Sequence, residues 1–445
     1  MNIVIIGGEA AGMSAAAKAR RVNPDATITV YEASEVISFG ACGLPYFIAD
    51  EFQDAGFMSE FTPEQFAERG ITVKTGHRVT KVDAKQKKLE ISHQGEQFVT
   101  GYDRLMIATG AKEVLPPVAG LDKQGVHTLR VMQDGFSLKA AVQAPFCQHV
   151  TVIGSGFIGL EVAEAMVHQG KKVRLIERAE RLIPDAFDSE ISIHFATELE
   201  KAGVEIHTGE SLKSILGDNR VNAVETDKGT YPTDLVVVCT GVKPNTDFLK
   251  ETGIETLDNG AIVVDRHGKT SLADVWAAGD CATIWHAVSG ENAYVPLATG
   301  ANKLGRMVGE NIALVDGEPL TFPGSLGTSC VRVLGLEAGR TGLSEQDAIR
   351  AGFNVKTLTI KDKCHTNYCA GQSDMHMKLV YEADSKRILG AQLLGYKGAV
   401  HRIDAMAVAI SAGLTTSQLG MMDFAYAPPF ARTWDIMNVA GNVAK

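Results

Sequence analysis

The sequence predicts an α/β protein with two nested Rossmann-like dinucleotide-binding domains, followed by a C-terminal α+β domain. Two observations support this fold class. The order strand, glycine-rich loop, helix, strand and acidic residue occurs twice in the 445-residue chain, from residue 3 and again from residue 150. The stretch after residue 320 contains short strand-like segments and one helix-like segment, but no such loop.

Composition narrows the class of function. The net charge is −10 and no block of Lys and Arg occurs, which argues against nucleic acid as the main partner. The chain begins directly with a strand, and no apolar run approaches the ~20 residues of a membrane span, so we expect neither a secretion signal nor a membrane anchor. Seven scattered cysteines fit thiols in a reducing compartment, so we expect a cytoplasmic protein.

The first repeat has an imperfect phosphate loop. Its segments are Ile3–Ile6, the loop Gly7–Gly12, a helix to about Arg21, the strand Thr27–Tyr31 and the acid Glu32. Gly7 and Gly12 hold two of the three glycine places, but Glu9 occupies the place where backbone would approach a pyrophosphate. The acid at the end of the second strand strengthens the interpretation as a dinucleotide site.

The second repeat is complete. It runs through Val150–Ile153, the loop Gly154–Gly159, a helix to about Gln169, the strand Lys172–Ile176 and Glu177. Gly154 permits the tight turn, Gly156 permits close approach of a pyrophosphate, and Gly159 permits close helix–strand packing. Glu177 follows where a carboxylate accepts a hydrogen bond from a ribose 2′-hydroxyl. The alternative is a glycine-rich turn of an ordinary α/β fold.

The last part of the chain has a different pattern. Strands are predicted at Asn354–Ile360, Met375–Tyr381 and Gly390–Gly395, and a helix at about Val400–Ala412 ends at Gly413. An aromatic tail follows. Without a nucleotide loop, this part is expected to form a separate α+β domain.

Cys42 is the candidate redox residue. It follows the first repeat and precedes a predicted helix start with Pro45 in its first turn. A helix N-terminus lowers the pKa of a nearby thiol, and the thiolate is the nucleophile. The alternative is a buried, inert cysteine, which is the commoner fate of this residue type.

Three further segments carry a family resemblance. Thr270–Asp280 resembles the second FAD fingerprint of two-dinucleotide-binding flavoproteins, and Ala108–Ala111 and Cys239–Pro244 resemble that family's linker motifs. Together with the two glycine-rich loops, these make five motifs that cover about two-thirds of the chain. Their order is similar to that in the pyridine nucleotide-disulfide oxidoreductases. Ser38–Tyr46 resembles the single-cysteine branch, which contains coenzyme A-disulfide reductases, NAD(P)H persulfide reductases, NADH oxidases and NADH peroxidases.

The resemblance implies cofactors and domain bounds. FAD is expected at residues 1–112 and 248–320, NAD(P)H at 113–247, and a dimerisation domain at 321–445. The implied FAD residues are Gly7, Ala11, Gly12, Glu32, Ala33, Ser34, Val79, Ala108, Thr109, Gly110, Arg130, Gly279, Asp280, Leu297 and Ala298. The implied NAD(P)H residues are Gly154, Gly156, Phe157, Ile158, Gly159, Glu177 and Gly241. Coenzyme A as substrate or bound thiol is expected near Ser14, Lys18, Arg21, Ser38, Asn302 and Arg306.

Nucleotide preference depends on charge near Glu177. A carboxylate repels a 2′-phosphate, which favours NADH. Arg174 and Arg178 lie nearby in sequence and would favour NADPH if they reached that phosphate, so NADPH use stays open.

The resemblance also indicates the reaction. Dithiol reductases of the family have a second cysteine where this chain has Phe47, so Cys42 would form a mixed disulfide with a small thiol. Family oxidases and peroxidases carry a histidine where this chain has Ala10. We therefore expect reduction of coenzyme A disulfide or a persulfide. The alternatives are an NADH oxidase that makes water or peroxide through a cysteine sulfenic acid, and a redox-sensing or electron-carrier flavoprotein.

Two tyrosines match the coenzyme A-disulfide reductase type. Tyr368 and Tyr426 would reach the active site from the partner subunit of a homodimer, where a phenol can protonate a leaving thiolate. The chain departs from the family pattern at Ala41, and at Cys369 and Ala370, which replace a frequent tyrosine and proline.

Cys364 and Cys369 have C-x4-C spacing with His365 between them. Two cysteines offer too few ligands for a structural zinc site, so no metal is expected and incidental thiols are favoured. A second hypothesis is that Cys369 resolves a persulfide or mixed disulfide.

Overall fold

The structure, a computed structural model, describes residues 1–445. Its contacts divide the chain into two compact units. The first comprises Met1–Leu44, Gln53–Val114 and Val242–Ser325, and the second comprises Pro45–Phe52, Leu115–Gly241 and Leu326–Lys445. No helix is long and apolar enough to cross a bilayer. The predicted three-domain bounds stay a prediction.

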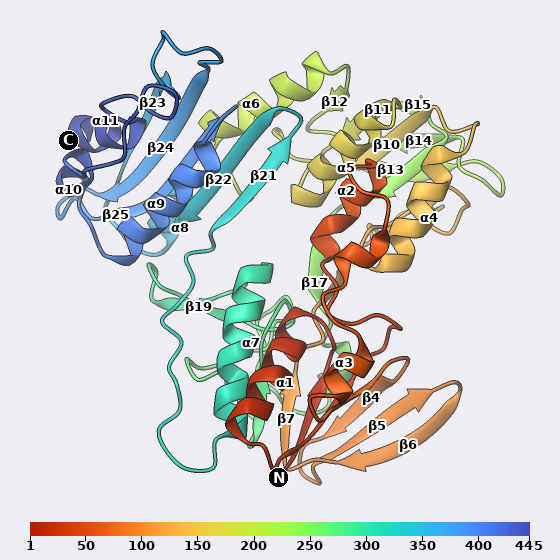
Figure 1. The fold of residues 1–445 in the computed structure, drawn as a ribbon. Coiled ribbons are helices and arrows are strands. Elements are labelled where there is room, and N and C mark those ends of the chain that lie inside the picture. The colour runs from red at the N-terminus through yellow and green to blue at the C-terminus, as the bar shows by residue number, and fades with distance from the viewer. The chain divides into compact units, whose positions relative to one another are not determined.

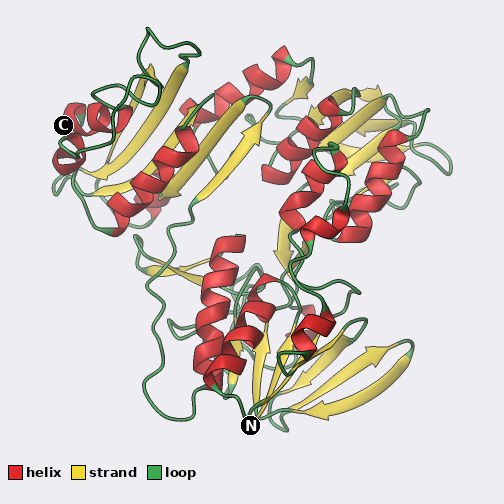
Figure 2. Cartoon of the chain, viewed as in Figure 1, coloured by secondary structure: helices red, strands yellow, loops and turns green.

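The first unit is built on a five-stranded parallel sheet of order β18-β7-β1-β2-β3 (Figures 1 and 2). Its strands are β1 (Asn2–Ile6), β2 (Thr27–Tyr31), β3 (Ile71–Lys74), β7 (Arg104–Ile107) and β18 (Val275–Ala277). The chain leaves β1 in the middle of the sheet and reaches β2 on one side and β7 on the other. This is the doubly wound topology predicted from the first repeat.

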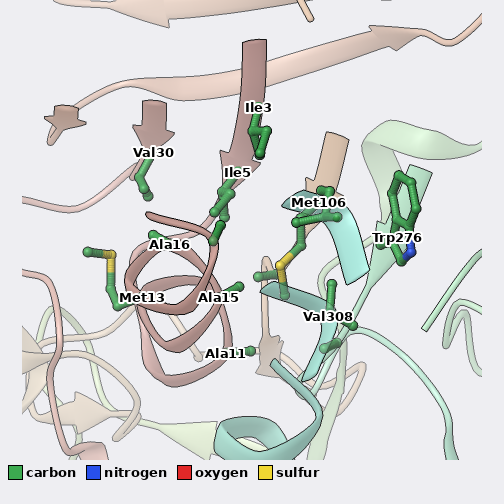
Figure 3. Close-up of a cluster of buried hydrophobic side chains, with 14 of the residues drawn as sticks. Ile3, Ile5, Ala11, Met13, Ala15, Ala16, Val30, Met106, Trp276 and Val308 are labelled. Atoms are coloured by element: carbon green, nitrogen blue, oxygen red, sulfur yellow. The ribbon is translucent and has the colours of Figure 1, made fainter. Parts of the chain in front are cut away.

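Two helices of this unit pack against each other at close range. They are α1 (Ala10–Val22) and α7 (Ala298–Ala313). A Cβ added to Gly305 would lie 2.5 Å from the carbonyl oxygen of Ala11, and one added to Gly309 would lie 2.3 Å from that of Ala15. Figure 3 shows the core beside this contact, where Ile5 from the sheet lies over Ala15 and Ala16 of α1, and Met106 lies near Val308 of α7. The two glycines therefore set the spacing of the helices.

The remaining elements of the first unit are short. They are an antiparallel sheet of β4 (Arg78–Asp83), β5 (Lys88–His93) and β6 (Glu96–Gly101), the pairs β8 (Ala111–Glu113) with β17 (Val242–Pro244) and β19 (Ile284–His286) with β20 (Glu291–Ala293), the helix α3 (Pro63–Ala67), and 3-10 helices at Ala41–Gly43, Ala55–Met58 and Asp247–Leu249. The helix α2 (Leu44–Ile48) begins at the last residue of the segment Met1–Leu44 and continues into the second unit.

The second unit contains another parallel sheet, of order β12-β11-β10-β16-β9. Its strands are β9 (Val126–His127), β10 (His149–Ile153), β11 (Lys172–Ile176), β12 (Glu205–His207) and β16 (Leu235–Val238), with the helices α4 (Met132–Gln143), α5 (Phe157–His168) and α6 (Ser189–Lys201) and a small sheet of β13 (Leu212–Leu216), β14 (Ala223–Thr226) and β15 (Thr230–Pro232). The second predicted Rossmann-like repeat is therefore confirmed.

The same unit contains a five-stranded antiparallel sheet of order β21-β22-β25-β24-β23. Its strands are β21 (Ser329–Val333), β22 (Leu336–Gly342), β23 (Val355–Lys363), β24 (Asp374–Glu382) and β25 (Ile388–Gly395), and its helices are α8 (Glu345–Arg350), α9 (Ala399–Ser411), α10 (Thr416–Gly420) and α11 (Ile436–Val443). The three predicted strands and the predicted helix are present, and β21 and β22 were missed. The predicted fold class is confirmed.

The glycine contact between α1 and α7 gives the first testable prediction. Gly309→Ala places a methyl group against backbone that cannot rotate away, so we expect a loss of about 1–3 kcal/mol of unfolding free energy and a melting temperature several degrees lower. Gly101→Ala is the matched control, because its Cβ would have its nearest neighbour at an ordinary 3.6 Å. Thermal melts of both variants test this, and equal melting temperatures would contradict it.

Candidate active site and dinucleotide loops

The first phosphate loop depends on two backbone contacts. Gly7 has φ +108°, and a Cβ there would lie 2.2 Å from the carbonyl oxygen of Ala108. A Cβ on Gly12 would lie 1.9 Å from the carbonyl oxygen of Gly7. The loop leaves β1 at the edge where β2, β7 and β18 also end, since all are parallel. These glycines hold strand, loop and helix together at backbone distance.

Glu9, which breaks the glycine pattern, directs its side chain to a neighbouring segment of the chain. Its carboxylate accepts a hydrogen bond from the backbone N–H of Phe39 at 3.1 Å. Glu32 accepts from the N–H of Gly8 at 2.7 Å and from that of Ser34 at 2.7 Å. The acid at the end of β2 is thus positioned by the loop, and the N-terminus of α1 can receive an anion.

The glycines of the second phosphate loop are of two kinds. Two of them pack against protein backbone, and the third faces open space. A Cβ on Gly154 would lie 2.4 Å from the carbonyl oxygen of Cys239, and one on Gly159 would lie 2.0 Å from that of Gly154. A Cβ on Gly156 would have nothing within 4 Å. The protein's own packing therefore gives no reason for glycine at 156. Close approach of a phosphate to the N-terminus of the 12-residue α5 does.

Glu177 lies almost buried at the end of β11, with 8% of its surface exposed. It accepts hydrogen bonds from the N–H of Ser155 at 2.9 Å, its hydroxyl at 2.8 Å, and the N–H of Ala179 at 2.8 Å. Arg174 is paired with Glu205 at 2.8 Å. The suggested role of Arg174 and Arg178 in binding a 2′-phosphate stays a prediction.

The other predicted FAD residues mostly follow strands of the first sheet. Ala108–Gly110 follow β7, Gly279 and Asp280 follow β18, and Leu297 and Ala298 begin α7, whereas Val79 lies on β4. Arg130, another predicted FAD residue, belongs to the second unit, as does Gly241, which was predicted for NAD(P)H. The glycine cradles and the acids Glu32 and Glu177 fit two dinucleotides, while the individual residue assignments stay predictions.

Cys42 is exposed and lies in the 3-10 turn Ala41–Gly43 of the first unit. All seven cysteines are thiols. The predicted helix after Cys42 exists, but α2 has only five residues, so its dipole contributes less to the thiol than the sequence suggested.

The segment after Cys42, Pro45–Phe52, is held within the second unit. The Lys139 ammonium donates to the Phe47 carbonyl at 2.7 Å, pairs with Asp50 at 2.7 Å and lies 3.9 Å from the centre of the Phe47 ring. Gln169 donates to the Ile48 carbonyl at 2.8 Å and to Asp50 at 2.6 Å. The last carbonyls of α2 thus find partners on α4 and next to α5.

Sequence reasoning missed a charged cluster beside this segment. The Tyr46 hydroxyl donates to Glu161 at 3.4 Å, and Arg332 lies 5.1 Å from the ring centre and pairs with Glu164 at 3.0 Å and with Glu51. Burial, with the nearby Glu164 carboxylate, raises the pKa of Glu161 to about 7. Burial and Glu161 raise the pKa of Tyr46. Two acids on the otherwise apolar helix α5 were the available signal.

The predicted tyrosines lie together in the second unit. The hydroxyls of Tyr368 and Tyr426 are 3.3 Å apart, and the side chains are exposed. This hydrogen bond raises the pKa of Tyr426.

The predicted substrate residues of α1 and α7 already have partners in the first unit. The Ser14 hydroxyl donates to Asn302 at 2.8 Å, and Lys18 pairs with Glu310 at 2.9 Å. Arg21 lies in the last turn of α1, Arg306 lies on α7, and Ser38 has a left-handed backbone at φ 49°. The structure thus places the predicted substrate residues other than Ser38 on the paired helices, and their substrate roles stay predictions.

Comparison with known proteins decides the family. Residues 1–303 match the pyridine nucleotide-disulphide oxidoreductase family, and residues 328–437 match its dimerisation domain. The chain belongs to this family. The expectations of an FAD- and NAD(P)H-dependent oxidoreductase with a C-terminal dimerisation domain are therefore confirmed.

Three relatives show the range of the family. The chain is 36% identical to an NAD(P)H coenzyme A polysulfide/persulfide reductase of Pyrococcus horikoshii, with all of this chain and 98% of the relative covered. It is 32% identical to an NADH oxidase of Methanocaldococcus jannaschii, with coverage of 100% and 98%. The solved NAD-dependent persulfide reductase of A. fulgidus superimposes with a TM-score of 0.95 at 34% identity, over 100% of this chain and 83% of that one.

The open space at Gly156 gives a second prediction. Gly156→Ala should fold normally, since its methyl group meets no protein atom, but it should weaken NADH binding by about tenfold because the methyl occupies the phosphate cradle. Titration of NADH against the holoenzyme measures the affinity, and a melt checks folding. An unchanged affinity would mean that the phosphate does not approach here.

The raised pKa of Glu161 gives a third prediction. The folded state holds a proton on this carboxyl that the unfolded state loses near pH 4.5, so stability falls as pH rises from about 4.5 to 7. Glu161→Gln removes this dependence. Above pH 8 the variant should gain on the order of 2 kcal/mol relative to wild type, and at about pH 4 and below the gain should vanish. Melts of both proteins across this range measure the difference, and a pH-independent difference would contradict it.

Proposed function

We propose that this enzyme uses NAD(P)H and FAD to reduce a low-molecular-weight disulfide or persulfide, with coenzyme A disulfide or coenzyme A persulfide as the substrate class. The observation that carries the proposal is the combination of an exposed thiol at Cys42 with a buried phenylalanine at the second cysteine's place. Phe47 is 5% exposed and lies under the Lys139 ammonium. Cys42 therefore needs an external sulfur as its redox partner.

The chemistry follows from a single sulfur. The Cys42 thiolate attacks one sulfur of the substrate disulfide, the S–S bond breaks, and one thiolate leaves while a mixed disulfide forms. Two electrons then release the second thiol and restore the Cys42 thiolate. With a persulfide, the products are a thiol and sulfide.

The chain's residues serve binding and proton supply. Gly7, Gly12 and Glu32 would hold FAD, and Gly156 and Glu177 would hold the nicotinamide nucleotide. When bound, these cofactors supply the two electrons. We infer that Tyr426, aligned by its hydrogen bond with Tyr368, gives a proton to the leaving thiolate in the partner subunit's active site of a homodimer. The relatives named for persulfide reduction support this substrate class.

An NADH oxidase is the second candidate, because the M. jannaschii relative has that name at 32% identity. Oxygen chemistry through a cysteine sulfenic acid needs a proton donor beside the cysteine. Ala10, at the start of α1, has no such group, which favours the thiol substrate. We further propose a preference for NADH, since Glu177 lies at the loop while Arg174 is paired with Glu205. We also propose a cytoplasmic location, because seven scattered cysteines fit thiols in a reducing compartment.

One experiment tests the proposed function. Holoenzyme is denatured without reductant and the released small thiol is identified by mass spectrometry. We expect coenzyme A from wild type and none from Cys42→Ser, whose NADH-dependent reduction of coenzyme A disulfide should fall by at least about 10³-fold because the nucleophile is lost. Cys330→Ser, an exposed thiol on β21, is the control and should keep full activity. Full activity in Cys42→Ser would overturn the proposal, and an oxidised Cys42 without an adduct would favour the oxidase.

A further inference from the structure

The turn Cys364–Ser373, between β23 and β24, contains a thiol–imidazole pair that the proposed reaction does not use. The Cys364 sulfur lies 3.0 Å from Nδ1 of His365. Both side chains are buried, with 2% and 1% of their surface exposed. A cysteine and a histidine at hydrogen-bond distance are the two parts of an activated thiol, provided that the ring presents a basic nitrogen to the sulfur.

The hydrogen bond made by Nε2 of His365 determines whether Nδ1 can act as that base. Nε2 of His365 lies 3.2 Å from the carbonyl oxygen of Cys369. A carbonyl only accepts hydrogen bonds, so Nε2 carries the hydrogen, and in the neutral ring Nδ1 presents its lone pair to Cys364. The Cys364 thiol therefore donates to a base that is oriented by a third group, the arrangement that activates nucleophiles in enzymes.

Further polar groups surround the Cys364 sulfur. The backbone N–H of Ser373 donates to the Cys364 sulfur at 3.2 Å, and the Ser373 hydroxyl lies 3.4 Å away. The Arg402 guanidinium donates to the Cys364 carbonyl at 3.2 Å and so fixes the start of the turn. These contacts hold the Cys364 sulfur in place beside the imidazole.

The residue whose carbonyl orients the ring is itself a cysteine. Cys369 is partly exposed, and its N–H closes a turn on the Thr366 carbonyl at 3.3 Å. It adjoins Tyr368, whose hydroxyl lies 3.3 Å from that of Tyr426. The turn thus places an accessible thiol outside, an activated thiol inside, and one imidazole that contacts both residues.

We propose that Cys364 and Cys369 form a second dithiol centre, in which Cys369 takes a sulfane sulfur from a persulfide and Cys364 releases it as sulfide. This inference rests on the proposed function for its substrate class. The Cys369 thiolate attacks the terminal sulfur of RS–SH, the S–S bond breaks, RS⁻ leaves, and Cys369–S–SH forms. Cys364 then attacks the inner sulfur, Sγ of Cys369, while His365 takes the Cys364 proton. The bond from Sγ to the outer sulfur breaks, HS⁻ leaves, and a Cys364–Cys369 disulfide remains.

The atoms and electrons of the proposed reaction balance, and its final product is a substrate of the main reaction. One persulfide and two cysteine thiols become RSH, hydrogen sulfide and one protein disulfide, so two electrons pass from the cysteines to the persulfide. Two further RSH reduce the protein disulfide by thiol–disulfide exchange and become RSSR. The disulfide RSSR is a substrate of the proposed Cys42 reaction.

The test uses full-length Cys42→Ser holoenzyme, which isolates the turn from the main site. It is treated anaerobically with coenzyme A persulfide without NAD(P)H, alkylated, and digested with trypsin under non-reducing conditions. The peptide from Cys364 to Lys378 contains both cysteines and no internal Lys or Arg. We expect it to lose both alkylation sites and two hydrogen atoms, with one sulfide released per chain.

Variants separate the steps. Cys364→Ser should stop at a persulfide, seen as one extra sulfur on Cys369, and Cys369→Ser should leave Cys364 reduced. His365→Gln should slow disulfide formation by about tenfold while the persulfide accumulates, since the base is lost. Cys330→Ser, the exposed thiol on β21, is the control and should change nothing in the turn.

Two results would overturn the inference. The first is a peptide with both cysteines still alkylated after treatment. The second is equal sulfur uptake at Cys330 and Cys369 without a disulfide, which would mean non-specific sulfuration. If wild type turns over persulfide while the turn stays reduced, only this inference fails. If the turn becomes oxidised while wild type shows no turnover, only the proposed function fails.

Discussion

Both dinucleotide loops depend on one constraint, the contact of loop backbone with the backbone of a neighbouring strand end. At Gly7 and Gly154 an added Cβ would lie 2.2 and 2.4 Å from a carbonyl oxygen of the segment that follows β7 or β16. This contact brings the loop over the carboxyl edge of its parallel sheet and aims the N-terminus of the next helix at the same place. The acids Glu32 and Glu177 then bind their loops through backbone N–H groups, so each candidate nucleotide site is built around its glycines.

Local sequence predicted most of this arrangement because its causes are local. Strand, glycine, helix and acid follow one another within about 30 residues in each repeat, which is the span of one βαβ unit. Even Glu9, which breaks the first pattern, is explained by a contact with Phe39, a residue of the next loop. The strands β21 and β22 were missed, although they pair with each other over a tight connection. Their segment includes Arg332, Arg340 and several glycines, which weaken a strand pattern.

The cluster around the Pro45–Phe52 segment could not be predicted in this way. Tyr46, Glu161 and Arg332 are far apart in sequence and meet only through packing within the second unit. None of them matches a local motif, and the pKa of Glu161 depends on burial that no single segment reveals. The contact of Lys139 with Phe47 also depends on packing. The Lys139 ammonium lies over the Phe47 ring and donates to the Phe47 carbonyl, and both contacts stabilise the C-terminal end of α2.

Sulfur chemistry in this chain is arranged by what each cysteine has beside it. Cys281 is buried and Cys239 is partly exposed. Desolvation raises the pKa of the Cys239 thiol to about 12 and that of the Cys281 thiol to about 11, so both stay protonated and inert. Cys42 is exposed, and Phe47 stands where a dithiol reductase would place its second cysteine, so this segment offers Cys42 no second thiol. Cys364 is buried like Cys281, yet it has an oriented imidazole and a backbone N–H directed at its sulfur. Burial alone therefore does not distinguish Cys364 from an inert thiol. A buried thiol also needs a proton acceptor to become a nucleophile, and Cys364 has a candidate acceptor in Nδ1 of His365, whereas the buried Cys281 sulfur contacts backbone carbonyls.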